Sequence, residues 1–162
     1  MKKMSLVREA TIDDINEVQE LWRRLLVDQM SQDIYYHGDM KFERDRKELE
    51  EKLTSEWSKI FLYIEDGKPV GFMEVEKHYP DFNFFHDYYA YVLHYYVDEA
   101  YRKAAGSVQM YIEVVKWAKE KECKYLEADA FEYNKKARTI LEGIVKMKPY
   151  RTRFVRCLEK TV

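Results

Sequence analysis

The sequence contains little cysteine, proline or glycine: 2, 3 and 5 residues respectively in a chain of 162. Two isolated cysteines, Cys123 and Cys157, exclude a disulfide framework and fit a reducing compartment. No apolar run reaches the roughly 18 residues that a membrane span needs, and the first residues lack the apolar core of a secretory signal. Because no Pro- or Gly-rich linker interrupts the chain, we expect a single domain, residues 1–162, in the cytoplasm and away from membranes.

The charge is balanced overall but unevenly distributed. The chain has 28 Lys/Arg and 30 Asp/Glu, a net charge of -2, which argues against a general nucleic-acid binder. Residues 101–162 carry 15 basic and 8 acidic side chains, a net of +7, so residues 1–100 carry a net of -9. This asymmetry suits binding of an anion by the basic part of the chain and of a cation by the acidic part. Two solvated faces of opposite charge would give the same counts.

Hydrophobic periodicity predicts an α/β fold with a mixed sheet. Strands are expected at 5–9, 60–64, 69–76, 88–97, 125–131 and 151–158, and helices at 12–30, 42–57, 102–121 and 134–146. Asp66-Gly67 predicts a tight hairpin between the second and third strands. The strand–helix–strand unit at 88–131 should have parallel strands. On its helix we expect an inward face made of Val108, Tyr111, Ile112 and Val115.

The segment from Tyr96 to Ser107 indicates a phosphate-binding site. It leaves a strand, carries Arg102 and Lys103, and opens a helix with small residues. Free N–H groups at a helix N-terminus bind phosphate, and small side chains let a pyrophosphate approach the backbone. A tight strand-to-helix turn with no ligand is the alternative interpretation.

This segment resembles the cofactor motif of the GNAT superfamily of acetyl-CoA-dependent N-acetyltransferases, Val-Asp/Pro-x-x-Tyr-Arg followed by x-x-Gly-x-Gly/Ala. Residues 7–14, residues 64–72 and Asn134-x-x-Ala137 resemble further family segments in the same order. The resemblance implies a GNAT-like domain with a central mixed sheet of about six to seven strands flanked by about four helices. It implies that acetyl-CoA, without a metal, is bound by Tyr95, Tyr96, Val97, Arg102, Lys103, Ala104, Ala105, Gly106, Ser107, Asn134 and Ala137.

The resemblance also implies that an amine attacks the thioester carbonyl directly in a ternary complex. An alkylammonium with a pKa of about 10 must first lose a proton, so a base is needed. Candidate bases are Glu74, His94 and Asp87, for which the alternatives are a solvent-facing carboxylate, a core histidine and a loop residue. A backbone N–H near Tyr95, Tyr96 or Val97 would stabilise the developing oxyanion.

Two departures from the family pattern bear on catalysis. Ala105 and Ser107 occupy the positions usually held by glycine. Leu141 stands where the family often has a tyrosine that acts as the general acid. Tyr133 is therefore the candidate general acid, with Tyr150 as a second choice and packing as the alternative for both. The departures keep open a non-catalytic acyl-CoA-binding regulatory or protein-interaction domain.

Acidic residues interleave with aromatic ones in the stretches 28–58 and 78–100, which the resemblance places beside the acceptor. The aromatic residues are Tyr35, Tyr36, Tyr79, Phe82, Phe84 and Phe85. Such a rim favours a cationic amine, either a small molecule or a lysine-bearing peptide. The same residues are equally compatible with a homodimer surface.

Overall fold

The computed structural model describes residues 5–33, 43–83 and 87–159. Contacts divide the chain into two compact units, residues 1–129 and 130–162. Within the described ranges, no helix is long and apolar enough to cross a membrane.

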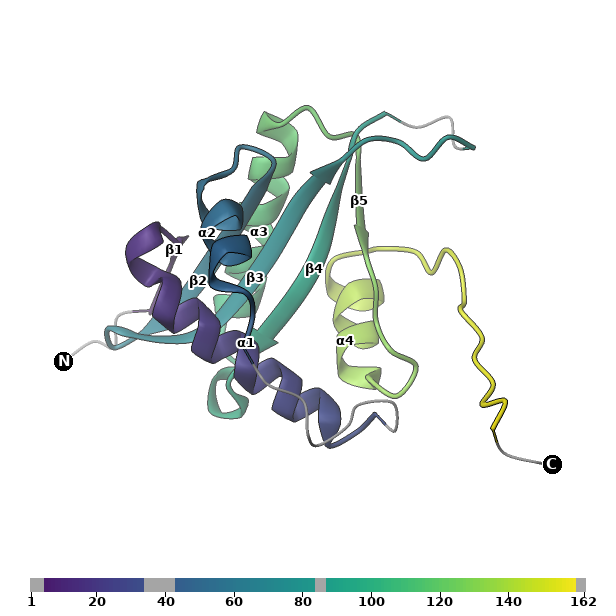
Figure 1. The fold of residues 1–162 in the computed structure, drawn as a ribbon, viewed down its shortest axis with the longest axis horizontal. Coiled ribbons are helices and arrows are strands. Elements are labelled where there is room, and N and C mark those ends of the chain that lie inside the picture. Colours follow the sequence, from purple (N-terminus) through teal and green to yellow (C-terminus); the bar gives the residue numbers. More distant parts are fainter. Residues whose placement is uncertain (1–4, 34–42, 84–86, 160–162) are drawn as a thin grey trace. The chain divides into compact units, whose positions relative to one another are not determined.

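The first unit is built on one mixed sheet (Figure 1). Its strands follow the order β1-β2-β3-β4-β5, with β1 to β4 antiparallel and β5 parallel to β4. The strands are β1 (Ser5–Glu9), β2 (Ser58–Glu65), β3 (Lys68–His78), β4 (Tyr89–Val97) and β5 (Tyr125–Ala128). The helices are α1 (Ile15–Met30), α2 (Arg46–Thr54) and α3 (Gly106–Glu120).

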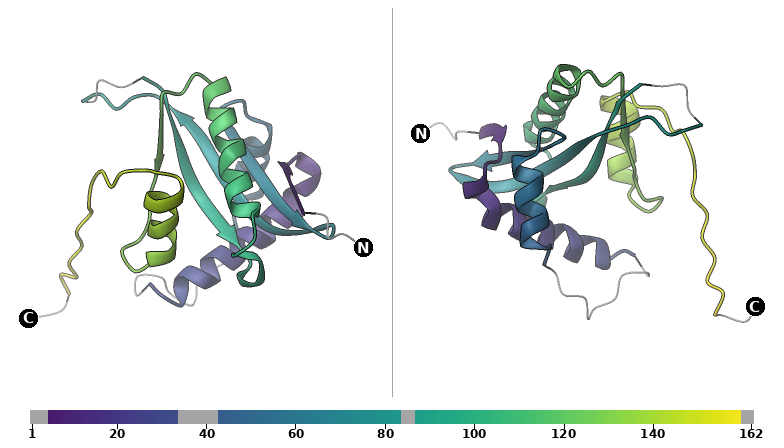
Figure 2. Two further views of the ribbon diagram at one scale, coloured as in Figure 1. Left: turned by 180° about the vertical axis from the view of Figure 1, so that it is seen from behind. Right: turned by 45° about the horizontal axis from the view of Figure 1, so that its top comes forward.

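Helices cover both faces of this sheet, with α1 and α2 on one side and α3 on the other (Figure 2). Successive side chains of a strand point to opposite faces. In β2, Phe61 and Tyr63 therefore pack in the cluster under α3, whereas Ile60 and Leu62 pack in the cluster under α1 and α2. The two hydrophobic cores explain why β2 and β3 read as nearly continuous apolar runs.

The predicted hairpin is confirmed. Glu65 pairs with Lys68 across a two-residue turn, and both turn residues have positive φ, +48° at Asp66 and +78° at Gly67. An Asp-Gly pair suits such a turn because both residue types tolerate the left-handed region.

The predicted inward face of α3 is only partly correct: Tyr111 packs against the hydrophobic cluster, but Val108 and Ile112 do not belong to the buried face. Val108 and Ile112 are more than a third exposed, at 37% and 39%. The buried face consists of Gly106, Ser107, Met110, Val114, Trp117 and Ala118. The close approach of the first turn to β2 orients the helix, and this tertiary contact cannot be read from periodicity alone.

The second unit contains α4 (Lys135–Thr139), which continues as a π-helical turn at Ile140–Ile144. The expectation of six to seven strands is corrected: the described residues form five, because residues 151–158 form no strand. Phe154 and Leu158 there are 90% and 87% exposed. An alternating pattern defines two faces, but a strand forms only where a partner supplies the hydrogen-bond ladder.

Candidate functional site

β4 parts from β5 partway along its length. The two strands pair only over residues 89–92 and 125–128, whereas β4 continues beside β3 to Val97. The pairing with β3 skips Leu93, which is the extra residue of a β-bulge. Beyond this bulge, within the part of the chain that the structure describes, no strand pairs with the outer edge of β4.

The backbone of Tyr95 faces this open edge. The Asp98 N–H donates to the carbonyl oxygen of Val70 in β3 at 2.7 Å. Successive residues of a strand direct their N–H and C=O groups to opposite edges. Tyr95 and Val97 therefore direct theirs away from β3, whereas those of Tyr96 point toward it. Of the three residues proposed to hold an oxyanion, Tyr95 and Val97 have the suitable backbone direction.

Arg102 fastens the loop that follows β4. Its Nε donates to the Val97 carbonyl oxygen at 2.7 Å, and its Nη2 lies 3.6 Å from the Asp28 carboxylate. Its guanidinium carbon is 5.7 Å from the centroid of the Tyr96 ring. These contacts direct Arg102 toward the end of β4, so its charge is partly engaged within the protein.

The small residues at the start of α3 have two different surroundings. Lys103, Ala104 and Ala105 are exposed, whereas Gly106 and Ser107 are buried. A Cβ added to Gly106 would come within 2.3–2.4 Å of atoms of the Tyr63 ring. The absent side chain at Gly106 therefore serves the packing of α3 on β2, in addition to any role at a phosphate.

Glu74 lies in a buried ion pair beside the bulge. The side chain is 0% exposed, which rules out the solvent-facing alternative. The Arg44 guanidinium donates to both of its carboxylate oxygens, at 2.7 and 2.9 Å. His94 is the cross-strand partner of Glu74, and its Nε2 lies 3.9 Å from Glu74 Oε2. Asp87, the third candidate base, is ion-paired with Lys124.

Burial shifts the pKa values of the side chains along β4. Burial is the largest cause that lowers the pKa of His94, and the charge of Glu74 opposes it. Burial raises the pKa of Tyr95. Burial, reinforced by a hydrogen bond to Asp98, also raises the pKa of Tyr96 to about 12. His94 therefore favours the neutral imidazole, and both tyrosines keep their protons near neutral pH.

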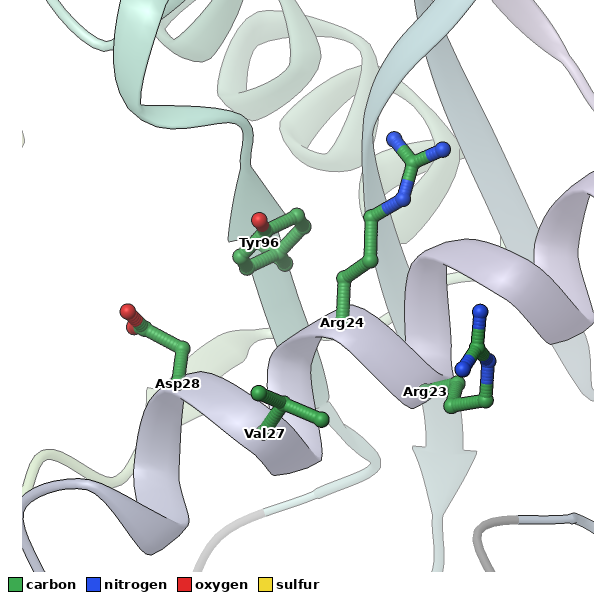
Figure 3. Close-up of a pocket in the computed structure, with 5 residues that line it drawn as sticks. All are labelled: Arg23, Arg24, Val27, Asp28 and Tyr96. Carbon is green, nitrogen blue, oxygen red and sulfur yellow. The ribbon is translucent and has the colours of Figure 1, made fainter.

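An open groove of about 330 Å³ lies between α1 and the end of β4 (Figure 3). Arg23, Arg24, Val27 and Asp28 line it from α1, and Tyr96 lines it from β4. Arg23 is ion-paired with Glu20, and Arg24 with Glu20 and Asp98. The lining therefore mixes both signs of charge and is not uniformly acidic.

A second pocket, also of about 330 Å³, lies over α2 and β3 and combines acidic and aromatic residues. It is lined by Glu48, Glu51, Lys52, Ser55, Trp57, Ser58, Glu76 and Lys77. The Trp57, Tyr79 and Tyr88 rings cluster beside it at centroid distances of 5.1 to 6.0 Å. The Lys77 ammonium lies 4.1 Å from the Tyr88 ring centroid.

Only part of the predicted aromatic rim can be placed. Tyr79 belongs to the ring cluster just described, and Phe82 is 99% exposed. Tyr35, Tyr36, Phe84 and Phe85 lie outside the described residues.

In the second unit, the Asn-x-x-Ala segment forms a helix cap. Asn134 Oδ1 accepts a hydrogen bond from the Ala137 N–H at 3.1 Å, which satisfies a free donor at the start of α4. Tyr133 stacks on Phe131 with 5.1 Å between ring centroids. Tyr150 is 68% exposed.

Sequence reasoning missed Arg44, whose side chain is 6% exposed. It bonds Glu48 at the i,i+4 spacing, a local signal that was readable. Its contact with Glu74, thirty residues away, had no sequence signal. The described residues hold no group of three or more His, Cys, Asp or Glu side chains that could bind a metal ion.

The sequence profile of the Acetyltransferase (GNAT) family matches residues 19–142. No curated protein matches the sequence. A mutant of the BH1408 protein from Bacillus halodurans has a similar fold, with a TM-score of 0.82, 15% identity, and coverage of 94% of this chain and 99% of that one.

Two further solved structures share the fold. AAC(6')-Iy in complex with a bisubstrate analogue, CoA-S-monomethyl-acetylneamine, has a TM-score of 0.75 and 17% identity, covering 95% of this chain and 98% of that one. The ribosomal-protein-alanine N-acetyltransferase from Brucella melitensis biovar Abortus 2308 has a TM-score of 0.66 and 16% identity, covering 95% and 100%.

Proposed function

Because the chain belongs to the acetyltransferase (GNAT) family, we propose that it is an acetyl-CoA-dependent N-acetyltransferase. It transfers the acetyl group to a primary amine of a small cationic substrate or a peptide, by direct attack in a ternary complex. The observation that carries the proposal is the edge of β4 beyond Leu93, where Tyr95 and Val97 direct backbone groups away from β3.

The residues present fit the proposed cofactor. An extended ligand arm can hydrogen-bond to a free strand edge as a further strand would. The exposed Lys103, Ala104 and Ala105, which lead directly into α3, suit a phosphate because their backbone is accessible and a positive charge stands beside it. In this proposal Arg102 holds the loop and Gly106 and Ser107 position the helix; Asn134 and Ala137 remain proposed cofactor residues on the strength of the family's Asn-x-x-Ala segment alone.

When bound, acetyl-CoA supplies the thioester whose carbonyl carbon the amine attacks. The Tyr95 N–H donates a hydrogen bond to the carbonyl oxygen as negative charge develops there. Glu74 and His94 are the two candidates for accepting the amine proton, and Tyr133 is the proposed proton donor to the leaving thiolate.

The acceptor site is the groove lined by α1 and Tyr96, on the face of β4 that His94 shares. Asp28, which also lies 3.6 Å from Arg102 Nη2, supplies the carboxylate there for an ammonium group, and the Tyr96 ring, which Arg102 also approaches, supplies a π face. Of the similar structures, AAC(6')-Iy is named as an aminoglycoside N-acetyltransferase and another protein as a ribosomal-protein-alanine N-acetyltransferase. These names support an amine or a peptide as acceptor.

Calorimetric titration with acetyl-CoA, with free CoA as comparator, tests the cofactor site. We expect micromolar binding, and weakening by about tenfold or more in Lys103→Glu, because a negative charge replaces a positive one beside the phosphates. Lys119→Glu, at the other end of α3, is the matched control and should bind as the wild type does. Absence of binding by the folded wild-type protein would contradict the proposal.

Turnover is then measured with a polyamine, an aminoglycoside and a peptide with a free N-terminus. Acetylation of at least one amine is expected. Tight acetyl-CoA binding without turnover on any of them would favour the non-catalytic acyl-CoA-binding domain, which the leucine at position 141 also favours.

A further inference from the structure

Glu74 is held too firmly to serve as a proton acceptor. Both of its carboxylate oxygens accept charge-assisted hydrogen bonds from Arg44, and neither side chain is more than 6% exposed. Protonating Glu74 would break this pairing and leave a guanidinium buried without its compensating charge. Such a loss is costly, and both carboxylate oxygens are already engaged by Arg44 rather than directed at an incoming amine.

Arg44 is itself fixed from several directions. Its Nε and Nη2 donate to the two Glu48 carboxylate oxygens at 3.1 and 2.8 Å. Its carbonyl oxygen accepts from Gln19 Nε2 at 3.1 Å. Its guanidinium carbon lies 5.8 Å from the Trp22 ring centroid. Contacts from α1, α2 and β3 therefore keep the Arg44–Glu74 pair in one geometry.

His94 is the accessible member of this cluster. Its side chain is 32% exposed, and its Nε2 lies 3.9 Å from Glu74 Oε2. Four charged groups act on the imidazole: Glu74 and Glu48 favour its protonation, whereas Arg44 and Lys52 oppose it. Together with burial, the net effect lowers the pKa of His94, so the ring is neutral and able to accept a proton near neutral pH.

We propose that His94 accepts the amine proton and that Arg44 and Glu74 are positioning residues of opposite charge that act through its imidazole. This inference rests on the proposed acetyltransferase function. The His94 imidazole takes one proton from the acceptor ammonium, which becomes an amine with a free lone pair. The imidazolium so formed is stabilised by the nearby Glu74 carboxylate and then releases its proton to water.

The first test measures the His94 imidazole titration by NMR, which needs no substrate. His94→Gln identifies the resonance. In Arg44→Gln the pKa of His94 should rise by about one pH unit, because a nearby positive charge is lost and the Glu74 charge is no longer compensated. In Glu74→Gln it should fall. Arg46→Gln, which removes an exposed arginine two residues along the chain, is the matched control and should leave the titration unchanged.

Opposite directions of shift are the decisive result, because a merely structural role would not produce them. Shifts in the same direction, or none, would overturn the inference. Should Arg44→Gln fail to fold, Arg44→Lys and Glu48→Gln replace it. Arg44→Lys keeps the positive charge, so the His94 titration should stay close to that of the wild type. Glu48→Gln removes a negative charge that favours protonation of His94, so it should lower the pKa of His94.

The second test is the pH dependence of kcat/KM. The acidic limb should shift to higher pH in Arg44→Gln, with activity recovered above the new pKa, whereas His94→Gln should lose about 10²- to 10⁴-fold in rate. If the Arg44→Gln variant is active but the acidic limb of its kcat/KM profile stays where it is in the wild type, the inference is overturned. Absence of acetyl-CoA binding by the wild type would instead contradict the proposed function, and the NMR titration would still decide the charge arrangement.

Discussion

At Gly106 helix α3 lies so close to β2 that a hydrogen atom alone fits between its backbone and the Tyr63 ring. Tyr63 is 0% exposed, so its ring has no solvent space into which to withdraw. The residue that best matches the family's cofactor motif is thus also one on which the packing of the first unit depends. Loss of acetyl-CoA binding after substitution there would not by itself identify a phosphate contact.

We expect Gly106→Ala to lower the free energy of unfolding by about 1–3 kcal/mol, as overpacking of a filled core does. Urea denaturation measures it. Tyr63→Leu in the same chain should recover part of the loss, because the leucine leaves the ring's place open. Gly143→Ala is the control, since a Cβ there meets no atom within 4 Å. Unchanged stability with lost acetyl-CoA affinity would show that the glycine serves the phosphate instead.

At the scale of elements, α1 is fastened to β1 where the two meet. The Arg8 guanidinium donates to both Asp14 carboxylate oxygens at 2.8 Å, and the Thr11 N–H donates to Asp14 at 2.8 Å. Chiefly because of the Arg8 hydrogen bonds, the pKa of Asp14 falls to about 2. This contact sets the start of the helix that lines the groove at Tyr96.

The pH dependence follows from that pKa. The folded-state value lies below the usual one of about 4, so the stabilisation is present above pH 4 and is lost as pH falls toward 2. Near pH 7, Asp14→Asn should reduce the free energy of unfolding by about 1 kcal/mol, after allowance for solvent screening. Denaturation curves across this pH range should converge with the wild type at the acidic end. Asp13→Asn is the control, and a difference that persists at pH 2 would contradict the assignment.

The elements that sequence reasoning predicted well are those set by local chemistry. The Asp66-Gly67 turn and the apolar runs of β2, β3 and β4 carry their structure in neighbouring residues. The inward face of α3 depends on Gly106 meeting Tyr63, a contact between distant segments. The expected strand at 151–158 failed because alternation does not supply a partner.

In the candidate site too, the features that the sequence could predict are those formed by neighbouring residues. The segment at 96–107 could be proposed as a phosphate site because its strand, basic pair and small residues are adjacent in the chain. The bulge at Leu93 adds one residue to a strand without changing its composition, so nothing in the sequence located it. The Arg44–Glu74 pair joins residues thirty positions apart, and only the fold brings them together.

For the whole molecule, the hydrophobic clusters and the family match have different extents. Both clusters lie within residues 1–129. The family match, by contrast, runs on to residue 142 and so includes α4. Since the proposed cofactor contacts at Asn134 and Ala137 also belong to the second unit, we retain a single functional domain, residues 1–162, as a proposal.

Two probes of unfolding test whether the units act as one domain. Tryptophan fluorescence reports on the first unit alone, through Trp22, Trp57 and Trp117. A fluorophore on Lys136→Cys, in a chain with Cys123→Ala and Cys157→Ala, reports on α4. We expect one urea midpoint from both probes, because a single domain unfolds cooperatively.

The same two unfolding curves are then measured in the presence of acetyl-CoA. At a ligand concentration of about 100 times its Kd, binding to the folded state alone adds about 2.7 kcal/mol to the free energy of unfolding. If α4 contributes to the cofactor site, both midpoints must rise together. The fluorophore on α4 could instead report a lower urea midpoint that acetyl-CoA does not change. That result would show that the second unit unfolds separately, and it would remove Asn134 and Ala137 from the proposed site.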